Sequence, residues 1–188
     1  MTELVECNTQ LHKTLQGLWS NALTQHKLQQ QELACFMSNY RQCHFNAAKH
    51  LLCYLQGTRM YGIIYVGIEN SPPIFRSFAN LDWAMSEGHR SILGYLIECG
   101  GGPITWSSKQ QVIVTLSSYE AEYLSCTHCA CQIIWLHSLF NKLGFPQTQP
   151  SILYCDNQGT VTCTHDPHSH SRIKHIDICA HFICTCVN

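Results

Sequence analysis

The residue with the clearest potential for chemistry is Glu122. It lies within 117–143, a stretch whose pattern predicts one long amphipathic helix. At about 100° per residue, Glu122 falls on the apolar stripe of that helix. The stripe continues through Cys126, Cys129, Ile133, Leu136 and Phe140. A carboxylate buried there is costly unless a cation, a metal ion or a proton neutralises it. The alternative is a glutamate at the rim of the helix that reaches water.

Three further polar residues stand near the ends of predicted strands. Asp156 ends a short apolar segment, and Asn80 and Asp82 lie near the end of another. Strand side chains alternate, so Asn80 and Asp82 face the same side. Because sites in α/β sheets form at strand ends, Glu122, Asp156 and this pair can meet. Acidic oxygens without Lys or Arg beside them indicate a hard cation such as Mg²⁺.

The helices and strands that must position these residues are predicted from the spacing of apolar residues and from the residues that end helices and strands. Ser117 with Glu120 forms a capping box, and Gly144 and Pro146 end the long helix. We expect strands at 61–67, 74–82, 91–98, 104–107 and 151–156, and helices at 45–55, 158–164 and 178–187. A helix is also plausible within 1–32. The order predicts an α/β mixed sheet: three antiparallel strands, the long helix, a fourth parallel strand and further helices.

Composition limits the class of protein. The 188 residues are 45% hydrophobic and only 12% charged, with a formal charge of -1, so no strong basic field steers the chain to nucleic acid. The amino terminus resembles no signal peptide, and no apolar run is long enough to span a membrane. We therefore expect a cytoplasmic or nuclear protein without a membrane partner, in which the 13 cysteines are thiols.

Several motifs carry a resemblance to a known family. They are "SFANLDWAMSEGHRSILGYLIECGGGPITWSSKQQVIVTLSSYEAEYLS", "WLHSLFNKLGFP", "YCDNQGTV" and "HSRIKHIDICAHFI". Together they resemble the ribonuclease H domain of copia-type retrotransposon polyproteins. The stretch "LACFMSNYRQCHFNAAKHLLCYLQGTRMYGIIY" resembles the segment that connects the reverse transcriptase to that domain. The resemblance implies a divergent segment at 1–32, the connection at 33–70, and a ribonuclease H-like domain at 71–188 that is truncated before its final strand.

The resemblance also implies a reaction, hydrolysis of the RNA strand of an RNA–DNA hybrid with Mg²⁺ or Mn²⁺ held by carboxylates. Glu122 and Asp156 match two metal ligands of the family. Asn80 stands where the family has its first-strand aspartate, and Asp82 is a possible substitute two residues along. Asp177 belongs to the "KHID" motif and is a further candidate. An amide brings no negative charge to Mg²⁺, so we expect Asn80 and the truncation to impair cleavage.

The implied partners are an RNA–DNA hybrid or another nucleic acid, together with a reverse transcriptase domain. Five residues match polar family positions and are candidates for the nucleic-acid face: Lys109, His170, Arg172, Lys174 and His175. The alternative is that they are ordinary solvated loop residues.

Cysteine and histidine spacings raise a zinc hypothesis. The ligand-like groups are Cys126, Cys129 and Cys131; His165, His168 and His170; and Cys179, His181, Cys184 and Cys186. The resemblance accounts for several Cys and His differently, since they stand where related sequences carry Arg or Lys, as decay of Arg codons in an element copy would produce. A bound zinc ion is therefore not expected. Three functions stay open: a ribonuclease H, a non-catalytic or domesticated interaction module for nucleic acid or protein, and a zinc-stabilised binding protein.

Overall fold

The computed structural model describes residues 2–6, 33, 36–66, 74–82, 92–111, 118–165, 182–183 and 185–186. The chain divides into two compact units. The first comprises Met1–Thr9 and Ile64–Asn188, and the second comprises Gln10–Ile63. The predicted site residues Glu122, Asp156 and Asn80 belong to the first unit.

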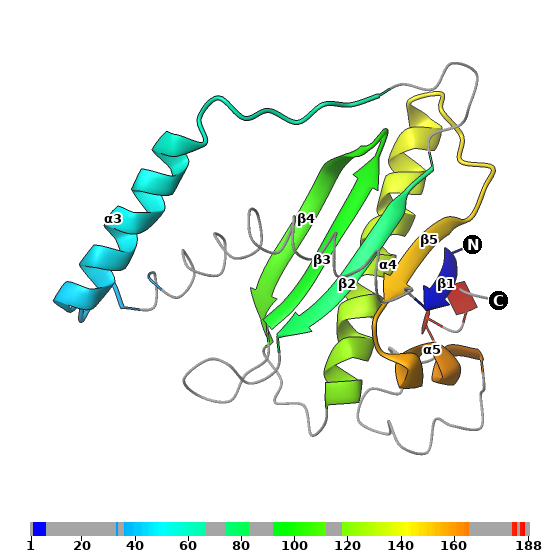
Figure 1. The fold of residues 1–188 in the computed structure, drawn as a ribbon. Coiled ribbons are helices and arrows are strands. Elements are labelled where there is room, and N and C mark those ends of the chain that lie inside the picture. Colours follow the sequence, from blue (N-terminus) through cyan, green and yellow to red (C-terminus); the bar gives the residue numbers. More distant parts are fainter. Residues whose placement is uncertain are drawn as a thin grey trace. The chain divides into compact units, whose positions relative to one another are not determined.

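A five-stranded mixed sheet forms the first unit, in the order β1-β5-β2-β3-β4 (Figure 1). Its strands are β1 (Thr2–Glu6), β2 (Arg76–Asp82), β3 (Ile92–Cys99), β4 (Gly102–Gln110) and β5 (Ser151–Cys155). β2, β3 and β4 form an antiparallel meander, and β5 pairs in parallel with β2. The predicted architecture of three antiparallel strands, a long helix and a parallel strand is confirmed, and the sheet is ribonuclease H-like.

Short turns and alternating burial explain the meander and its parallel neighbour. The turn between β3 and β4 places Gly100 and Gly101 at φ 62° and 80°, a left-handed region that favours glycine. In β5, Ser151, Leu153 and Cys155 are buried and alternate with half-buried residues. This alternation is expected of a strand with one face on the core.

The long helix α4 (Ser118–Lys142) lies across one face of the sheet, against β2 and β3 (Figure 1). Its predicted stripe faces the core, where Cys126, Cys129, Ile133 and Leu136 are buried and Phe140 packs against them. The helix ends before Gly144, whose φ of 85° stops further helical turns. Glu122 therefore lies on the side of α4 that faces the sheet.

Strand β1 corrects the expectation of a helix for the start of the chain. Thr2–Glu6 pairs in parallel with β5, from Thr2 beside Ser151 to Glu6 beside Cys155. An open edge of β5 would present unpaired backbone N–H and C=O groups, and an extended segment satisfies them. Strand β1 therefore covers the edge of β5.

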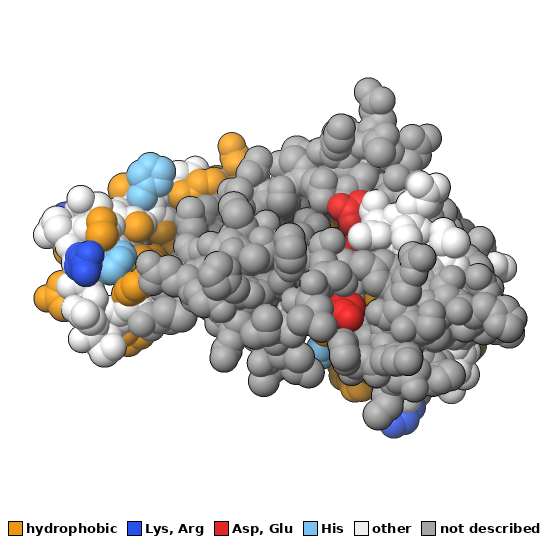
Figure 2. Space-filling model, turned by 90° about the horizontal axis from the view of Figure 1, so that it is seen from below, with side chains coloured by type: hydrophobic (Ala, Val, Ile, Leu, Met, Phe, Trp, Pro, Cys, Tyr) orange, Lys and Arg blue, Asp and Glu red, His pale blue; other side chains and the backbone are white. Residues whose placement is uncertain are grey.

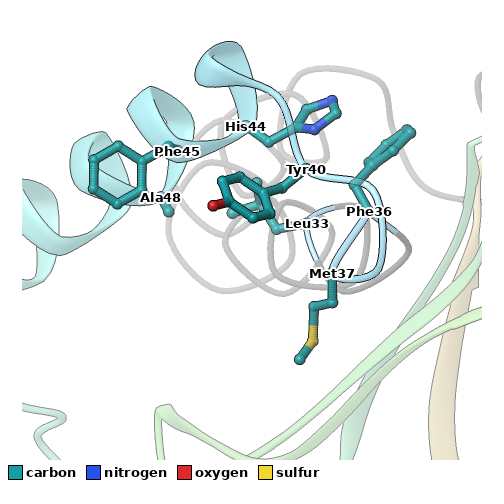
Figure 3. A pocket seen from close by; sticks show the side chains of 7 residues that line it. All are labelled: Leu33, Phe36, Met37, Tyr40, His44, Phe45 and Ala48. Atoms are coloured by element: carbon teal, nitrogen blue, oxygen red, sulfur yellow. The ribbon is translucent and has the colours of Figure 1, made fainter.

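The second unit contains α3 (Gln42–Gly57), predicted at 45–55. Its start is fixed by Arg41, whose backbone N–H donates to Nδ1 of His44 at 3.1 Å, while the His44 ring stacks on Phe36 at 4.1 Å. Beside this turn lies an open hollow of about 530 Å³. Figure 3 shows its lining of Leu33, Phe36, Met37, Tyr40, His44, Phe45 and Ala48.

Three large apolar side chains of α3 are open to solvent. Phe45, Leu52 and Leu55 are 49%, 64% and 47% exposed, whereas Leu51 is buried. The helix therefore forms without burying most of its large apolar side chains.

The strand expected at 61–67 is wrong for the six residues that are described, Tyr61–Val66, which form no strand. Instead, the Val66 N–H donates to the Gly100 carbonyl at 2.7 Å and the Tyr65 hydroxyl donates to the Pro103 carbonyl at 2.7 Å. These isolated bonds to the β3–β4 turn replace a strand ladder.

The last predicted helices lie around the carboxyl end. Helix α5 (Gln158–His165) follows β5, as expected for 158–164. Within the last predicted helix, residues 182–183 and 185–186 are helical. Among the described helices, none is long and apolar enough to cross a membrane.

Candidate metal site

Glu122, Cys155 and Asp156 form a cluster where α4 meets the end of β5. One ligand atom from each, a carboxylate oxygen or the Cys155 Sγ, lies within 4.8 Å of the other two. Glu122 and Cys155 are buried, whereas Asp156 is exposed. Two members of the cluster are therefore buried, and Asp156 is the member that solvent reaches.

Helix α4 fixes Glu122 through its neighbours. Ala121 and Tyr123 are fully buried on either side of it, and the Ser125 hydroxyl donates to the Gly94 carbonyl in β3 at 2.9 Å. This bond sets the rotation and height of the first helical turns over the sheet. Glu122 is therefore held on the side of α4 that faces the sheet.

The turn after β5 fixes Asp156. The Asn157 side-chain oxygen accepts the Thr160 backbone N–H at 3.1 Å and so caps α5. Cys155, one residue before Asp156, faces the core, and its thiol donates to the Asn157 carbonyl at 3.9 Å. The chain bends at Asp156, which brings its carboxylate toward Glu122.

Burial dominates the electrostatics of Glu122. Its side chain is 7% exposed, and Oε2 has no hydrogen-bond partner among the residues that are described. Loss of hydration, followed by repulsion from Asp156 and Cys155, raises the pKa of Glu122 to about 9. At neutral pH the Glu122 carboxyl is therefore protonated. This proton removes the negative charge that would otherwise be buried on the apolar stripe of the helix.

Two buried thiols lie against the carboxylates. A hydrogen bond between Cys126 and Cys155 raises the pKa of the Cys126 thiol and lowers the pKa of the Cys155 thiol. Such a bond favours the charged form of its acceptor. Cys155 is thus the more readily deprotonated of the pair.

Asn80 and Asp82 lie in β2, and their side chains fall outside the described part of the structure. The backbone register is informative, because Phe78 pairs with Tyr154 in the parallel β2–β5 ladder. This is the last pair of that ladder; Asn80 and Asp156 each follow it by two residues, and Asp156 lies at the bend after β5. The backbone of Asn80 also pairs with Gly94, the residue that anchors Ser125 of α4.

Most of the residues predicted to contact nucleic acid lie outside the described residues. Lys109 is exposed in β4, beside Leu93 of β3. The four other candidates, His170, Arg172, Lys174 and His175, and the site candidate Asp177, lie outside the described residues. In the face that Figure 2 presents, acidic side chains reach the surface.

Among the described residues, no three members of the zinc patterns come together. Cys131 and Cys186 do lie near each other, since burial and then Cys131 raise the pKa of the Cys186 thiol. Cys126 and Cys129 are buried, whereas Cys131 is exposed on the other side of α4. His168, His170 and most of the cluster at 179–186 lie outside the described residues, and His165 is described only as the last residue of α5. Among those described, the one group of metal-ligating side chains is Glu122, Cys155 and Asp156.

Sequence reasoning missed Cys155. Its signal was available in the alternation of β5, which turns residues 151, 153 and 155 toward the core. A thiol directly before a strand-end aspartate is then placed on the side of the sheet that α4 covers.

Comparison with known proteins identifies the family. The chain is 38% identical over 152 residues to the retrovirus-related Pol polyprotein from transposon RE1 of Arabidopsis thaliana, covering 80% of this chain and 10% of that protein. It is also 38% identical over 141 residues to the polyprotein from transposon RE2 of the same plant, covering 74% of this chain and 10% of the relative. The polyprotein from transposon TNT 1-94 of Nicotiana tabacum is 36% identical over 149 residues, which are 79% of this chain and 11% of that protein.

The match is to a part of these relatives, because the chain spans about a tenth of their length. No family model and no solved structure matches the chain. The assignment therefore rests on three polyproteins that each align with about three quarters or more of the sequence. The chain belongs to the copia-type retrotransposon Pol polyprotein family.

Proposed function

We propose that this chain is a ribonuclease H-like domain that binds RNA–DNA hybrids, holds a divalent cation between Glu122 and Asp156, and hydrolyses the RNA strand. The ribonuclease H-like sheet and the membership in the Pol polyprotein family support this function. The single observation that carries it is the Glu122 carboxyl beside the Asp156 carboxylate: it is 7% exposed, and its Oε2 has no hydrogen-bond partner among the described residues.

The donor chemistry of the cluster fits a divalent cation. Carboxylate oxygens are the ligands that Mg²⁺ and Mn²⁺ take in proteins, and a buried carboxyl without a partner is otherwise unfavourable. The 4.8 Å spread of the ligand atoms is close enough for one ion to contact Glu122 and Asp156 after small side-chain rotations. When bound, such an ion supplies positive charge for the charge that develops at a phosphate.

The protein residues have distinct roles. Glu122, with a pKa of about 9, gives up its proton to solvent when a cation replaces it. Asp156 is exposed and presents the open side of the site to a nucleic-acid backbone. Because α4 excludes water behind Glu122, the cation would act in a medium of lower dielectric than bulk water.

The test uses purified protein, a labelled RNA–DNA hybrid, and Mg²⁺ or Mn²⁺. We expect slow cleavage of the RNA strand that disappears in Glu122→Gln, which keeps the shape of the side chain. Hybrid binding should weaken as salt is raised, since phosphate contacts release counterions. Equal products from the wild type and Glu122→Gln would contradict the catalytic assignment.

A second candidate function is a hybrid-binding module without cleavage. Asn80 favours it, because Asn80 follows the last β2–β5 pair by two residues, as Asp156 does, and its amide adds no negative charge for a hard dication. Hybrid binding that persists in Glu122→Gln, with no cleavage by the wild type, would select this second function.

A further inference from the structure

Helix α3 of the second unit carries a stripe of apolar residues that is open to solvent. Phe45, Ala48, Leu52 and Leu55 follow one another at intervals of three, four and three residues, and we call these four residues the α3 seam. Phe45, Leu52 and Leu55 are exposed, and Ala48 is half-buried. Neighbouring apolar side chains that stay exposed in a folded protein mark an interaction surface.

The spacing of the α3 seam indicates the shape of what it contacts. Apolar residues three and four positions apart occupy positions a and d of a heptad, the pattern by which one α-helix packs along another. A β-strand presents side chains that alternate every second residue, which does not match this spacing. At 1.5 Å of rise per residue, the seam is about 15 Å long, enough for two heptads of a partner helix.

The open hollow beside α3 continues the seam at its amino-terminal end. Phe45 and Ala48 belong to both the seam and the lining of the hollow, which has a volume of about 530 Å³ (Figure 3). Bulky side chains that fill a pocket contribute much of the binding energy of protein interfaces. The hollow therefore offers a place for one large apolar side chain beside the seam.

The charges along this part of the chain are all positive. The Lys49 Nζ lies 4.7 Å from the centre of the Phe45 ring, and Arg41 stands at the N-cap of α3. From residue 33 to residue 68 the sequence contains three Lys or Arg residues and no Asp or Glu. Opposite charges across an interface attract and like charges repel, so the complementary helix is acidic along its flanks.

We propose that the α3 seam binds an acidic amphipathic helix of another protein, which packs along it as in a coiled coil. The described helices of a second copy of this chain do not match this description. The apolar stripe of α4 is buried against its own sheet, α5 contains no acidic residue, and a second α3 brings another Lys49 of the same sign. The inference concerns a different surface from Glu122 and does not depend on cleavage.

A nucleic acid is a poorer match for the α3 seam, although the positive charges suit phosphates. Single strands bind proteins largely through bases that stack on aromatic rings. Leu52 and Leu55 are aliphatic, and their spacing fits the side chains of a helix. The observations therefore favour a protein helix.

The experiment measures the binding of two labelled synthetic peptides to the full chain by fluorescence anisotropy. Both peptides have about four heptads with Leu at positions a and d, and they carry either Glu or Lys at positions e and g. We expect the Glu peptide to bind about tenfold more tightly than the Lys peptide at low salt, because like charges across an interface repel. Added salt should reduce this preference by screening the charges.

Matched variants locate the contact. Leu52→Ala and Leu55→Ala should each weaken binding of the Glu peptide by about tenfold, as truncation of an apolar anchor does, and both side chains are exposed, so the fold should be kept. His50→Ala changes an exposed residue of α3 that points away from the seam and should leave binding unchanged. Lys49→Glu should move the preference toward the Lys peptide by about tenfold, a reversal that loss of structure would not produce.

Equal affinity for the two peptides, or no binding of either, would overturn the proposal. Binding of the Glu peptide that is unchanged in both Leu52→Ala and Leu55→Ala would overturn it as well, because the contact would then lie elsewhere. Two further results would assign the seam to another occupant and reject an acidic helix. One is self-association of the chain in sedimentation velocity that Leu52→Ala abolishes, and the other is binding of a labelled single-stranded oligonucleotide that Leu52→Ala abolishes.

Discussion

Glu122 in α4 and Asp156 after β5 bring carboxylate oxygens within 4.8 Å of each other, although one residue is buried and the other is exposed. Two like charges this close in a partly dry site are unfavourable together, so one of them holds a proton or both share a cation. The buried partner takes the proton, and the pKa of Glu122 rises to about 9. The pair is therefore in a different charge state with and without a metal ion.

The first prediction concerns the pH dependence of the metal-free protein. A carboxyl whose pKa is 4.5 when unfolded and about 9 when folded binds more protons in the folded state throughout that interval. Folding stability should therefore fall as pH rises from about 4.5 to about 9, by up to ~1.4 kcal/mol per pH unit from this group. Urea unfolding with a chelator present, at several pH values, measures it.

Glu122→Gln is the control for this slope. It should match the wild type near pH 4 and exceed it in stability at pH 8, because the amide has no proton to lose. Other titrating groups cancel in the difference between the two proteins. A difference that does not change with pH would refute the buried, protonated carboxyl.

The second prediction concerns β1. Its five register pairs cover the edge of β5, from Thr2 beside Ser151 to Glu6 beside Cys155. At 0.2–1 kcal/mol per cross-strand pair, deletion of residues 1–6 should lower the free energy of unfolding by about 1–5 kcal/mol and favour association through the opened edge. Chemical denaturation and sedimentation velocity measure the two effects.

A point substitution within β1 separates strand pairing from loss of the terminus. Val5→Pro removes a backbone N–H and should reproduce most of the deletion, whereas Val5→Thr keeps a β-branched residue and should change stability little. If both variants behave alike, β1 does not hold the edge of β5 in solution.

Local patterns explain how much of this fold could be predicted. A long helix at the place of α4, and the meander, follow from the apolar stripe and the glycine turns, which are encoded by near neighbours. Strand β1 could not be predicted, because its five residues are defined by pairing with Ser151–Cys155 at the far end of the sequence. The segment Tyr61–Val66 reads as a strand by composition but finds no ladder.

The site divides in the same way. The helical stripe placed Glu122 among core residues, but whether it reached water depended on the sheet that α4 covers. Cys155 and Asp156 both lie close to the Glu122 carboxyl because the chain bends at the end of β5. Alternation alone would place them on opposite faces.

The third prediction tests the rotation of α4, which positions Glu122. Ile133 is 1% exposed and its neighbour Ile134 is 46% exposed. Ile133→Ala should lower the free energy of unfolding by about 2–5 kcal/mol through the lost contacts and the cavity, whereas Ile134→Ala should cost less than about 1 kcal/mol. Denaturant midpoints compare the two, and equal losses would mean that α4 is rotated differently.

The fourth prediction concerns Asn80, which follows the last β2–β5 pair by two residues, as Asp156 does. Asn80→Asp adds an anionic oxygen donor at a strand position next to the cluster, and hard dications favour such donors. Since each 1.36 kcal/mol of transition-state stabilisation is tenfold in rate, a well-placed ligand worth several kcal/mol should raise Mg²⁺-dependent cleavage of an RNA–DNA hybrid by about 10²–10³. Single-turnover cleavage of a labelled hybrid measures the gain.

Two controls make the gain specific to the metal site. Asn80→Ala should not increase cleavage, and Glu122→Gln combined with Asn80→Asp should abolish the increase, because the buried carboxylate is then missing. The same Asn80→Asp variant should bind Mg²⁺ more tightly in the absence of nucleic acid, since a third carboxylate changes the donor set toward oxygen. Unchanged cleavage and unchanged Mg²⁺ affinity in Asn80→Asp would show that the amide at this strand position is not what limits the site.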